Sequence, residues 1–181
     1  MNRLVAFVAM LVLLPGVSFA GWINRVGESL PETDARKSVG DFGAHLIFVG
    51  SDKELIKRWA IPSETVEFAS IDSVSVNGTI NAFVIFNGCK KNDAGDCSVV
   101  MRFRVIKPDG SIYAETPPMK AWHNRPAPVG HNLELSVEYL KVIIEPTDPL
   151  GVYEIQALVR DNHSGQVLQL KGPFTAVQER H

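Results

Sequence analysis

"GVYEIQALVRDNHSGQVLQLKGPF", residues 151–174, is the stretch that most clearly indicates the fold. In its first half apolar and polar residues alternate with a period of two, and turn-forming residues ("DNHSG") separate this half from the second. The pattern predicts a β-hairpin near the end of the chain. Tyr153 shares parity with Ile155, Ala157 and Val159, so we expect its ring to face the core.

The chain before this hairpin contains further strand patterns and few helix signals. Strands are predicted within residues 43–50, 64–76, 78–88, 97–108 and 132–146, the last of which holds one strand or two short ones. About seven strands at short spacing predict an all-β fold, an antiparallel β-sandwich.

One short helix is predicted in "SDKELIKRWA", residues 51–60. Ser51 is a suitable N-cap, and Asp52 and Glu54 place negative charge in the first turn, where the helix dipole favours it. Pro62 follows shortly after the end of the pattern, so the helix has two to three turns at most.

The residues "DPLGVY" sharpen the fold prediction. Asp148, Gly151 and Tyr153 form a D-x-x-G-x-Y pattern just before a strand. It resembles the tyrosine corner of exported bacterial immunoglobulin-like β-sandwich domains, which implies a hydroxyl that bonds back to the backbone. The cysteines depart from the antibody pattern because they are not spaced to link the two sheets. A core tyrosine in another kind of β-sandwich is the alternative.

The first twenty residues predict export. Arg3 precedes an apolar run over residues 4–14, and "SFA" supplies the small residues of a signal-peptidase site. We therefore expect residues 1–20 to be a signal peptide, 21–42 a loosely ordered segment with at most one edge strand, and 43–181 a single β-sandwich domain. The expected location is periplasmic or secreted, with no membrane span after cleavage.

The cysteine pair is predicted to be a structural disulfide, because exported proteins meet an oxidising environment. Cys89 and Cys97 lie in "FVIFNGCKKNDAGDCSVVMRFRV", residues 83–105, where seven polar or small residues separate them. A hairpin with the cysteines opposite each other would align the apolar residues of both strands on one face. That face would carry Phe83, Ile85, Met101 and Phe103. The spacing is too long for a C-x-x-C redox pair.

Composition and motifs argue against several functions. The formal net charge is −2, with acids and bases interspersed, which disfavours nucleic acid and strongly anionic membranes as partners. The sequence contains no nucleophile elbow, zinc-protease motif, phosphate loop or dinucleotide fingerprint. We therefore predict a protein that is not an enzyme and needs no cofactor.

The candidate binding region is "TPPMKAWHNRPAPVGH", residues 116–131. Its prolines argue against a central strand, and they lower the entropy cost of a preorganised loop. An exposed Trp beside an Arg is typical of an interaction hot spot. Alternatively, Trp122 folds back as a lid and the prolines protect a sheet edge. The candidate partner-binding residues are Met119, Trp122, His123, Arg125 and His131.

The sequence thus predicts a non-catalytic exported binding domain whose partner is a protein or a cell-envelope component. One alternative is a periplasmic copper- or zinc-binding protein with Met119, His123 and His131 as ligands, since thioether and imidazole suit copper. Another alternative is an envelope enzyme or an enzyme inhibitor.

Overall fold

The computed structural model describes Trp22 and residues 28–61, 68–129 and 132–178. The predicted signal peptide and His131 lie outside these residues. The elements are β1 (Arg36–Val39), β2 (Phe42–Val49), α1 (Asp52–Trp59), β3 (Ser73–Ser75), β4 (Thr79–Asn87), β5 (Asp96–Ile106), β6 (Ile112–Glu115), β7 (Met119–Pro126), β8 (Glu134–Leu135), β9 (Leu140–Ile143), β10 (Gly151–Asp161) and β11 (Val167–Val177). In the described part of the chain, no helix has the length and apolar character needed to cross a membrane.

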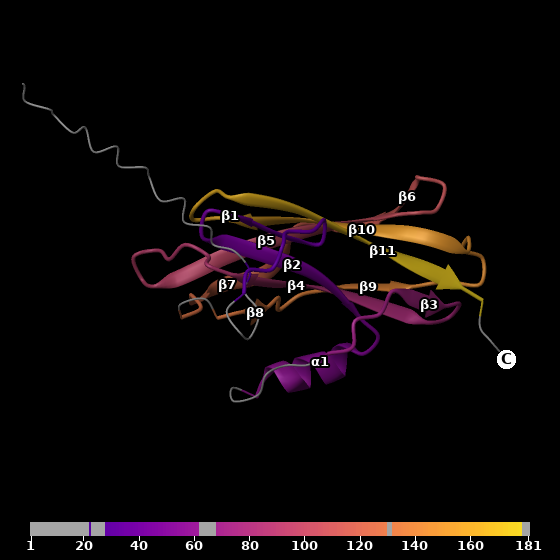
Figure 1. Ribbon diagram of the computed structural model, residues 1–181, viewed down its shortest axis with the longest axis horizontal. Helices are drawn as coiled ribbons and strands as arrows, with labels where there is room; N and C mark the ends of the chain where they lie inside the picture. Colours follow the sequence, from indigo (N-terminus) through magenta and orange to yellow (C-terminus); the bar gives the residue numbers. More distant parts are fainter. Residues whose placement is uncertain (1–21, 23–27, 62–67, 130–131, 179–181) are drawn as a thin grey trace, which may run out of the picture.

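The strands form two sheets packed as a sandwich (Figure 1). One sheet has the order β1-β2-β4, with β8 and β9 both pairing with β4; the other has the order β3-β11-β10-β5, with β6 and β7 both pairing with β5. All pairs are antiparallel except β3 with β11. The main core lies between the sheets and includes the fully buried rings of Phe42, Phe86, Phe103 and Tyr153. The predicted mostly-β sandwich with one short helix is confirmed.

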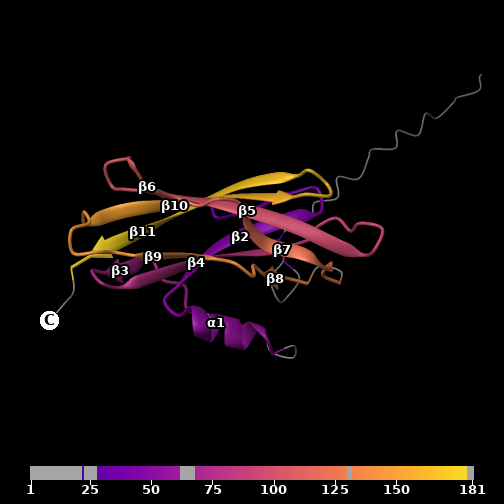
Figure 2. The same ribbon diagram turned by 180° about the vertical axis from the view of Figure 1, so that it is seen from behind.

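Helix α1 covers the outer face of the five-stranded sheet, on the side away from β10 and β11 (Figures 1 and 2). The Ser51 hydroxyl accepts from the Glu54 N–H at 3.3 Å, which confirms the predicted N-cap. Leu55 packs in a second apolar cluster with Phe83 and Ile85 of β4. Strand β4 is therefore apolar on both faces because both faces are covered.

The predicted terminal hairpin is confirmed. Strands β10 and β11 pair with Tyr153 opposite Phe174 and Arg160 opposite Val167. Tyr153 is completely buried and stacks on Phe174, with ring centroids 5.2 Å apart. The hairpin extends the six-stranded sheet because β10 also pairs with β5 along its length, with Ala157 opposite Phe103.

The hairpin predicted within residues 83–105 is wrong, because β4 and β5 belong to different sheets. Val84 of β4 faces the main core, whereas Phe83 and Ile85 face α1. A hairpin with Cys89 opposite Cys97 would also have set Arg102 opposite Val84, on the same face of one sheet. The face of β4 that carries Val84 is fully buried in the structure. Burying an unpaired guanidinium beside it would be costly. The chain instead crosses from one sheet to the other after β4.

The disulfide between Cys89 and Cys97 is present, with Cα atoms 6.0 Å apart. Its role differs from the expected one. Cys89 follows the end of β4 in one sheet, and Cys97 lies in β5 of the other, so the bond ties the sheets together at one end. The expectation that the cysteines do not link the two sheets is therefore wrong.

Much of the proline-rich segment forms a strand, which corrects the prediction of a loop. Residues Met119–Pro126 form β7, an edge strand paired with β5. Pro117 and Pro118 lie just before β7, and Pro126 is its last residue. Prolines at these positions remove no hydrogen bond from the interior of a sheet, so they are compatible with an edge.

The described residues form eleven strands instead of about seven, because several short edge strands lack a periodic signal. Part of residues 21–42 is built into the fold. Residues Arg36–Val39 form the edge strand β1, and Trp22 packs in the cluster beneath α1.

Candidate functional site

The outer face of the six-stranded sheet gathers basic side chains from several strands. Polar and charged residues alternate with core residues along β5, β10 and β11, so their side chains point to solvent. We call this surface, with Lys37 reaching it from β1, the basic face. Its cations are Lys37, Arg102, Arg104, Lys120, Arg160 and Lys171.

The strand register brings these side chains together. Arg104 and Lys171 both lie opposite Gln156, on either side of β10. Leu158, the next outward residue of β10, lies opposite Arg102. Adjacent strands are about 4.8 Å apart, so cations on neighbouring strands are close enough to contact the same ligand.

Acidic residues compensate only part of this charge. Lys171 lies 3.6 Å from Glu154 and 3.8 Å from Asp34, and Arg104 pairs with Glu115. Lys37 also lies near Asp34, at 4.0 Å. The side chains of these pairs are 33–68% exposed, so the pairing is weak and leaves the cations available to a ligand.

The remaining cations, as far as the structure describes the chain, are not held in ion pairs, although the Glu138 carboxylate lies beside Lys120 and accepts its backbone N–H at 2.6 Å. Within the ranges that the structure describes, Arg102, Lys120 and Arg160 form no ion pair. The face is thus net positive, although the chain as a whole carries a formal net charge of −2. This asymmetry produces a local positive potential that would attract anions.

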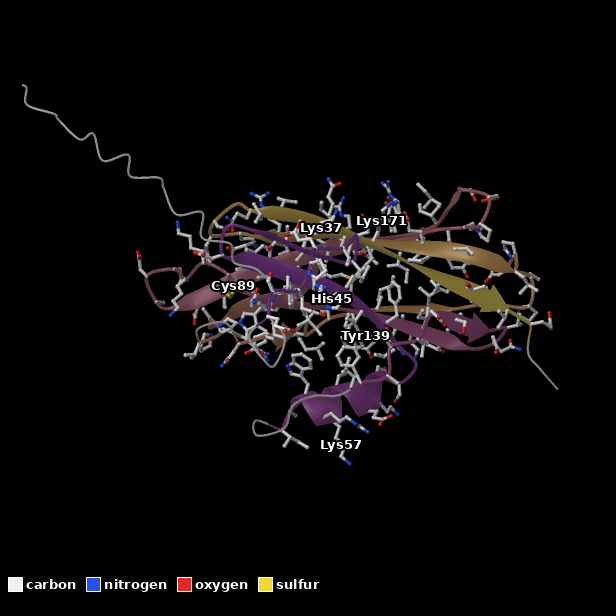
Figure 3. The ribbon with its side chains drawn as sticks, viewed as in Figure 1. Lys37, His45, Lys57, Cys89, Tyr139 and Lys171 are labelled. Carbon is white, nitrogen blue, oxygen red and sulfur yellow. A yellow bond between two sulfur atoms is a disulfide. The ribbon has the colours of Figure 1, made fainter. Side chains whose placement is uncertain are left out.

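A groove of about 520 Å³ crosses the centre of the basic face. Lys37 and Lys171 lie at one end of it and Arg104 and Glu115 at the other, and Figure 3 shows Lys37 and Lys171 together on the side remote from α1. Between these ends the lining residues include Arg102, Gln156, Leu158 and Gln169. The groove therefore offers cations and amides, with one exposed apolar side chain at its centre.

The candidate residues of β7 that face inward have packing roles. Met119 and Trp122 pack against the main core, and the Trp122 ring meets Phe86 edge-on at 5.8 Å. The indole N–H of Trp122 donates to the Pro126 carbonyl at 3.1 Å. The Arg125 guanidinium lies 5.0 Å from the centre of the same ring. This is the lid arrangement that the sequence offered as the alternative to a binding loop.

The structure does not bring the proposed metal ligands together. Met119 faces the core opposite Met101, whereas His123 is exposed and lies opposite Ser98, whose side chain is on the other face of β5. His131 is outside the described residues. Among the residues described, no three His, Cys, Asp or Glu side chains are arranged to hold a metal ion.

The residues of the predicted tyrosine corner have structural partners. The Tyr153 hydroxyl donates to the Pro149 carbonyl at 2.9 Å, the bond that the resemblance implies. Asp148 accepts from the Tyr113 hydroxyl at 2.8 Å and from the Glu145 N–H at 2.8 Å. Burial, and then this bond to Asp148, raises the pKa of Tyr113 to about 12.

The basic face was not predicted from the sequence, although part of its signal is visible there. Arg102 and Arg104 occupy the polar positions of an alternating strand, and Gln156 and Arg160 occupy those of another. What local patterns do not reveal is that these strands are neighbours, since β5 and β10 are far apart in the chain.

The sequence matches no protein-family model and no curated protein. Solved structures of similar fold include the following three. An immunoglobulin-like protein from Pseudomonas aeruginosa has a TM-score of 0.32 and 10% identity, covering 73% of this chain and 91% of that one. The CARDB domain of a Pyrococcus furiosus protein, solved with di-metal ions, has a TM-score of 0.34 and 17% identity. The match covers 60% of this chain and 87% of that domain's chain. A family 123 glycoside hydrolase from Clostridium perfringens has a TM-score of 0.41 and 10% identity. The match covers 76% of this chain and 27% of the hydrolase.

These comparisons concern the fold alone. The two sheets of the chain itself define it as a β-sandwich, and the similar structures include an immunoglobulin-like protein and a CARDB domain. It spans only about a quarter of the length of the glycoside hydrolase. At these TM-scores the likenesses carry no argument about a ligand or an activity.

Proposed function

We propose that this protein is a non-catalytic binding domain of the periplasm or cell exterior, and that it recognises an anionic cell-envelope partner through the basic face. The observation that carries the proposal is the gathering of cations around a groove on a chain of net negative charge. Charge of one sign placed on one face favours encounter with an oppositely charged partner.

Two tyrosines outside the basic face have pKa values that are raised by their structural surroundings. A hydrogen bond to Asp52 raises the pKa of Tyr139 and ties the sheet to the start of α1. Burial raises the pKa of Tyr153 inside the core. Each of these hydroxyls donates a hydrogen bond within the fold, Tyr139 to Asp52 and Tyr153 to the Pro149 carbonyl.

Binding to anionic probes would test the proposal. The chain from residue 21, with its disulfide intact, would be titrated with polygalacturonate, poly-L-glutamate and phosphatidylglycerol vesicles at low and physiological salt. We expect binding to at least one probe, weakening as salt rises. The double variant Arg102→Gln, Arg160→Gln should bind about tenfold or more weakly, because it loses two charge-assisted contacts.

The matched control is Lys53→Gln with Lys57→Gln, which removes the same charge from the exposed side of α1. Figure 3 shows Lys57 on the opposite side of the molecule from Lys37 and Lys171. This control should bind like the wild type. If all three proteins bind every probe equally, or if the wild type binds none of them, the proposed function is wrong.

A further inference from the structure

The groove of the basic face runs across the strands. From Lys171 on β11 it passes over Gln156 on β10 and Arg104 on β5 to Glu115 on β6. Three strand spacings of about 4.8 Å give this row a length of about 14 Å. A parallel row one pleat away contains Gln169, Leu158 and Arg102. An extended ligand would therefore meet positive charge at several points along its length.

The lining residues favour a ligand that carries both negative charges and hydroxyl groups. Arg102, without an ion-pair partner among the described residues, can pair a carboxylate through two parallel N–H donors. Gln156 and Gln169 each carry a donor and an acceptor, which suit hydroxyl groups. The Gln156 amide is already oriented by a 2.8 Å bond to Glu154.

A neutral polysaccharide fits the groove less well. A neutral sugar chain is usually bound by stacking on an exposed aromatic side chain, which offers a large rigid surface. A ligand recognised by its charge does not need such a surface. Phe103 is the one aromatic residue among those that line the groove, and its side chain is fully buried on the core side of β5. Binding energy here must come mainly from charge and hydrogen bonds.

An acidic peptide also fits less well. Peptides that bind sheets usually add a strand to a free edge, where their main-chain groups find partners. The groove instead lies over β10 and β5, which are paired on both sides. A peptide lying there would find no backbone partners, whereas a polysaccharide has no peptide groups to satisfy.

We infer that the groove binds a linear acidic polysaccharide, laid across the strands with its carboxylates on Arg102, Arg104 and Lys171 and its hydroxyls on the two glutamines. This inference rests on the proposed function and specifies its ligand class. Leu158 at the centre, 44% exposed, gives the chain of sugar rings an apolar contact.

Calorimetric titration with polygalacturonate and with the same polymer after methyl esterification would test this inference. Esterification removes the charge and keeps the sugar backbone, so we expect at least a tenfold loss of affinity. Monomeric galacturonate should bind far more weakly than the polymer because it reaches fewer cations. Poly-L-glutamate and phosphatidylglycerol vesicles should compete poorly.

The variant Gln169→Ala separates glycan recognition from charge attraction. The substitution should lower the affinity for polygalacturonate about threefold to tenfold and leave the affinity for poly-L-glutamate unchanged. The reason is that only the polysaccharide offers hydroxyl groups to Gln169. Circular dichroism of the variant would verify its fold.

The outcomes separate the two proposals. Preference for poly-L-glutamate or the vesicles, lost in Arg102→Gln with Arg160→Gln, would overturn the polysaccharide and leave the basic face as a binding surface. Equal affinity for the esterified and free polymers would also overturn it. Absence of binding to any probe would overturn both proposals.

Discussion

Gly88 fixes the point where the chain leaves the five-stranded sheet. Its φ of +65° lies in the left-handed region, and a Cβ built there would lie 1.7 Å from the Asp41 carbonyl oxygen. Gly88→Ala should therefore destabilise the protein by about 3 kcal/mol or more, since it adds a backbone clash to the conformational strain. Urea unfolding at 25 °C would measure the change in free energy of unfolding.

Gly95 supplies the matched control for this substitution. It also has a positive φ, +86°, but a Cβ there would meet no atom within 4 Å. Gly95→Ala should cost only about 1–2 kcal/mol, the strain alone. Equal costs at the two positions would show that the close approach to Asp41 does not constrain the crossover.

His45 should make stability depend on pH. It lies on β2 between Arg36 and Ile85, edge-on to Trp22. Burial, and then the charge of Arg36, lowers the pKa of His45 from 6.5 to about 4. The unfolded chain therefore binds more protons than the folded one between these values, so the stabilisation is present above pH 6.5 and is lost as pH falls towards 4.

We expect the wild type to lose about 1–2 kcal/mol between pH 7.5 and pH 4.5 relative to His45→Gln, after allowing for solvent screening of this partly exposed ring. Urea unfolding of both proteins at each pH gives the difference. Glu134, whose pKa is raised by burial, titrates in both proteins and cancels in the comparison. Parallel pH profiles for the two proteins would contradict this assignment.

Among the secondary-structure elements, those with strong local signals could be predicted and the choice of strand partners could not. Strand β10 and helix α1 follow from alternation and an N-cap, which involve residues close in sequence. The pairing of β4 depends on α1 covering Phe83 and Ile85, a contact between distant parts of the chain. Strand β7 could not be predicted because two register irregularities, near Ala121 and near Asn124, interrupt its alternation.

Helix α1 contributes stability through one side of its surface. Leu55 is 2% exposed beneath the helix, and its neighbour Ile56 is 45% exposed. Leu55→Ala should cost about 2–4 kcal/mol through loss of burial and a residual cavity. Ile56→Ala should change stability by less than about 0.5 kcal/mol, as expected of a surface position. Thermal and urea unfolding would compare the two, and similar losses would show that α1 is not packed as described.

At the scale of the whole molecule, the candidate site depends on topology more than on any motif. The segment that seemed most unusual in the sequence, residues 116–131, places Trp122 against the core. The basic face instead combines ordinary outward residues of β5, β10 and β11, which become a surface only when the sheet is assembled. Sequence patterns could predict that the side chains of Arg102 and Lys171 point to solvent. They could not predict that the two side chains lie on the same surface.

The disulfide also affects the whole molecule, since it joins the two sheets. In the chain-entropy model, closing so short a loop contributes about 2–3 kcal/mol to the free energy of unfolding. Cys89→Ala with Cys97→Ala should lose that amount in urea unfolding, yet remain folded at 25 °C because the core between the sheets is retained.

Polygalacturonate binding should survive in the double alanine variant. Arg102, Arg104 and Lys171 are positioned by pairing within the six-stranded sheet, and that pairing does not pass through the cysteines. Calorimetry on the wild type and the variant at 25 °C would compare their affinities, with near-ultraviolet circular dichroism reporting the packing of the aromatic residues. A large loss of affinity with that spectrum retained would mean that the bond between the sheets sets the shape of the groove.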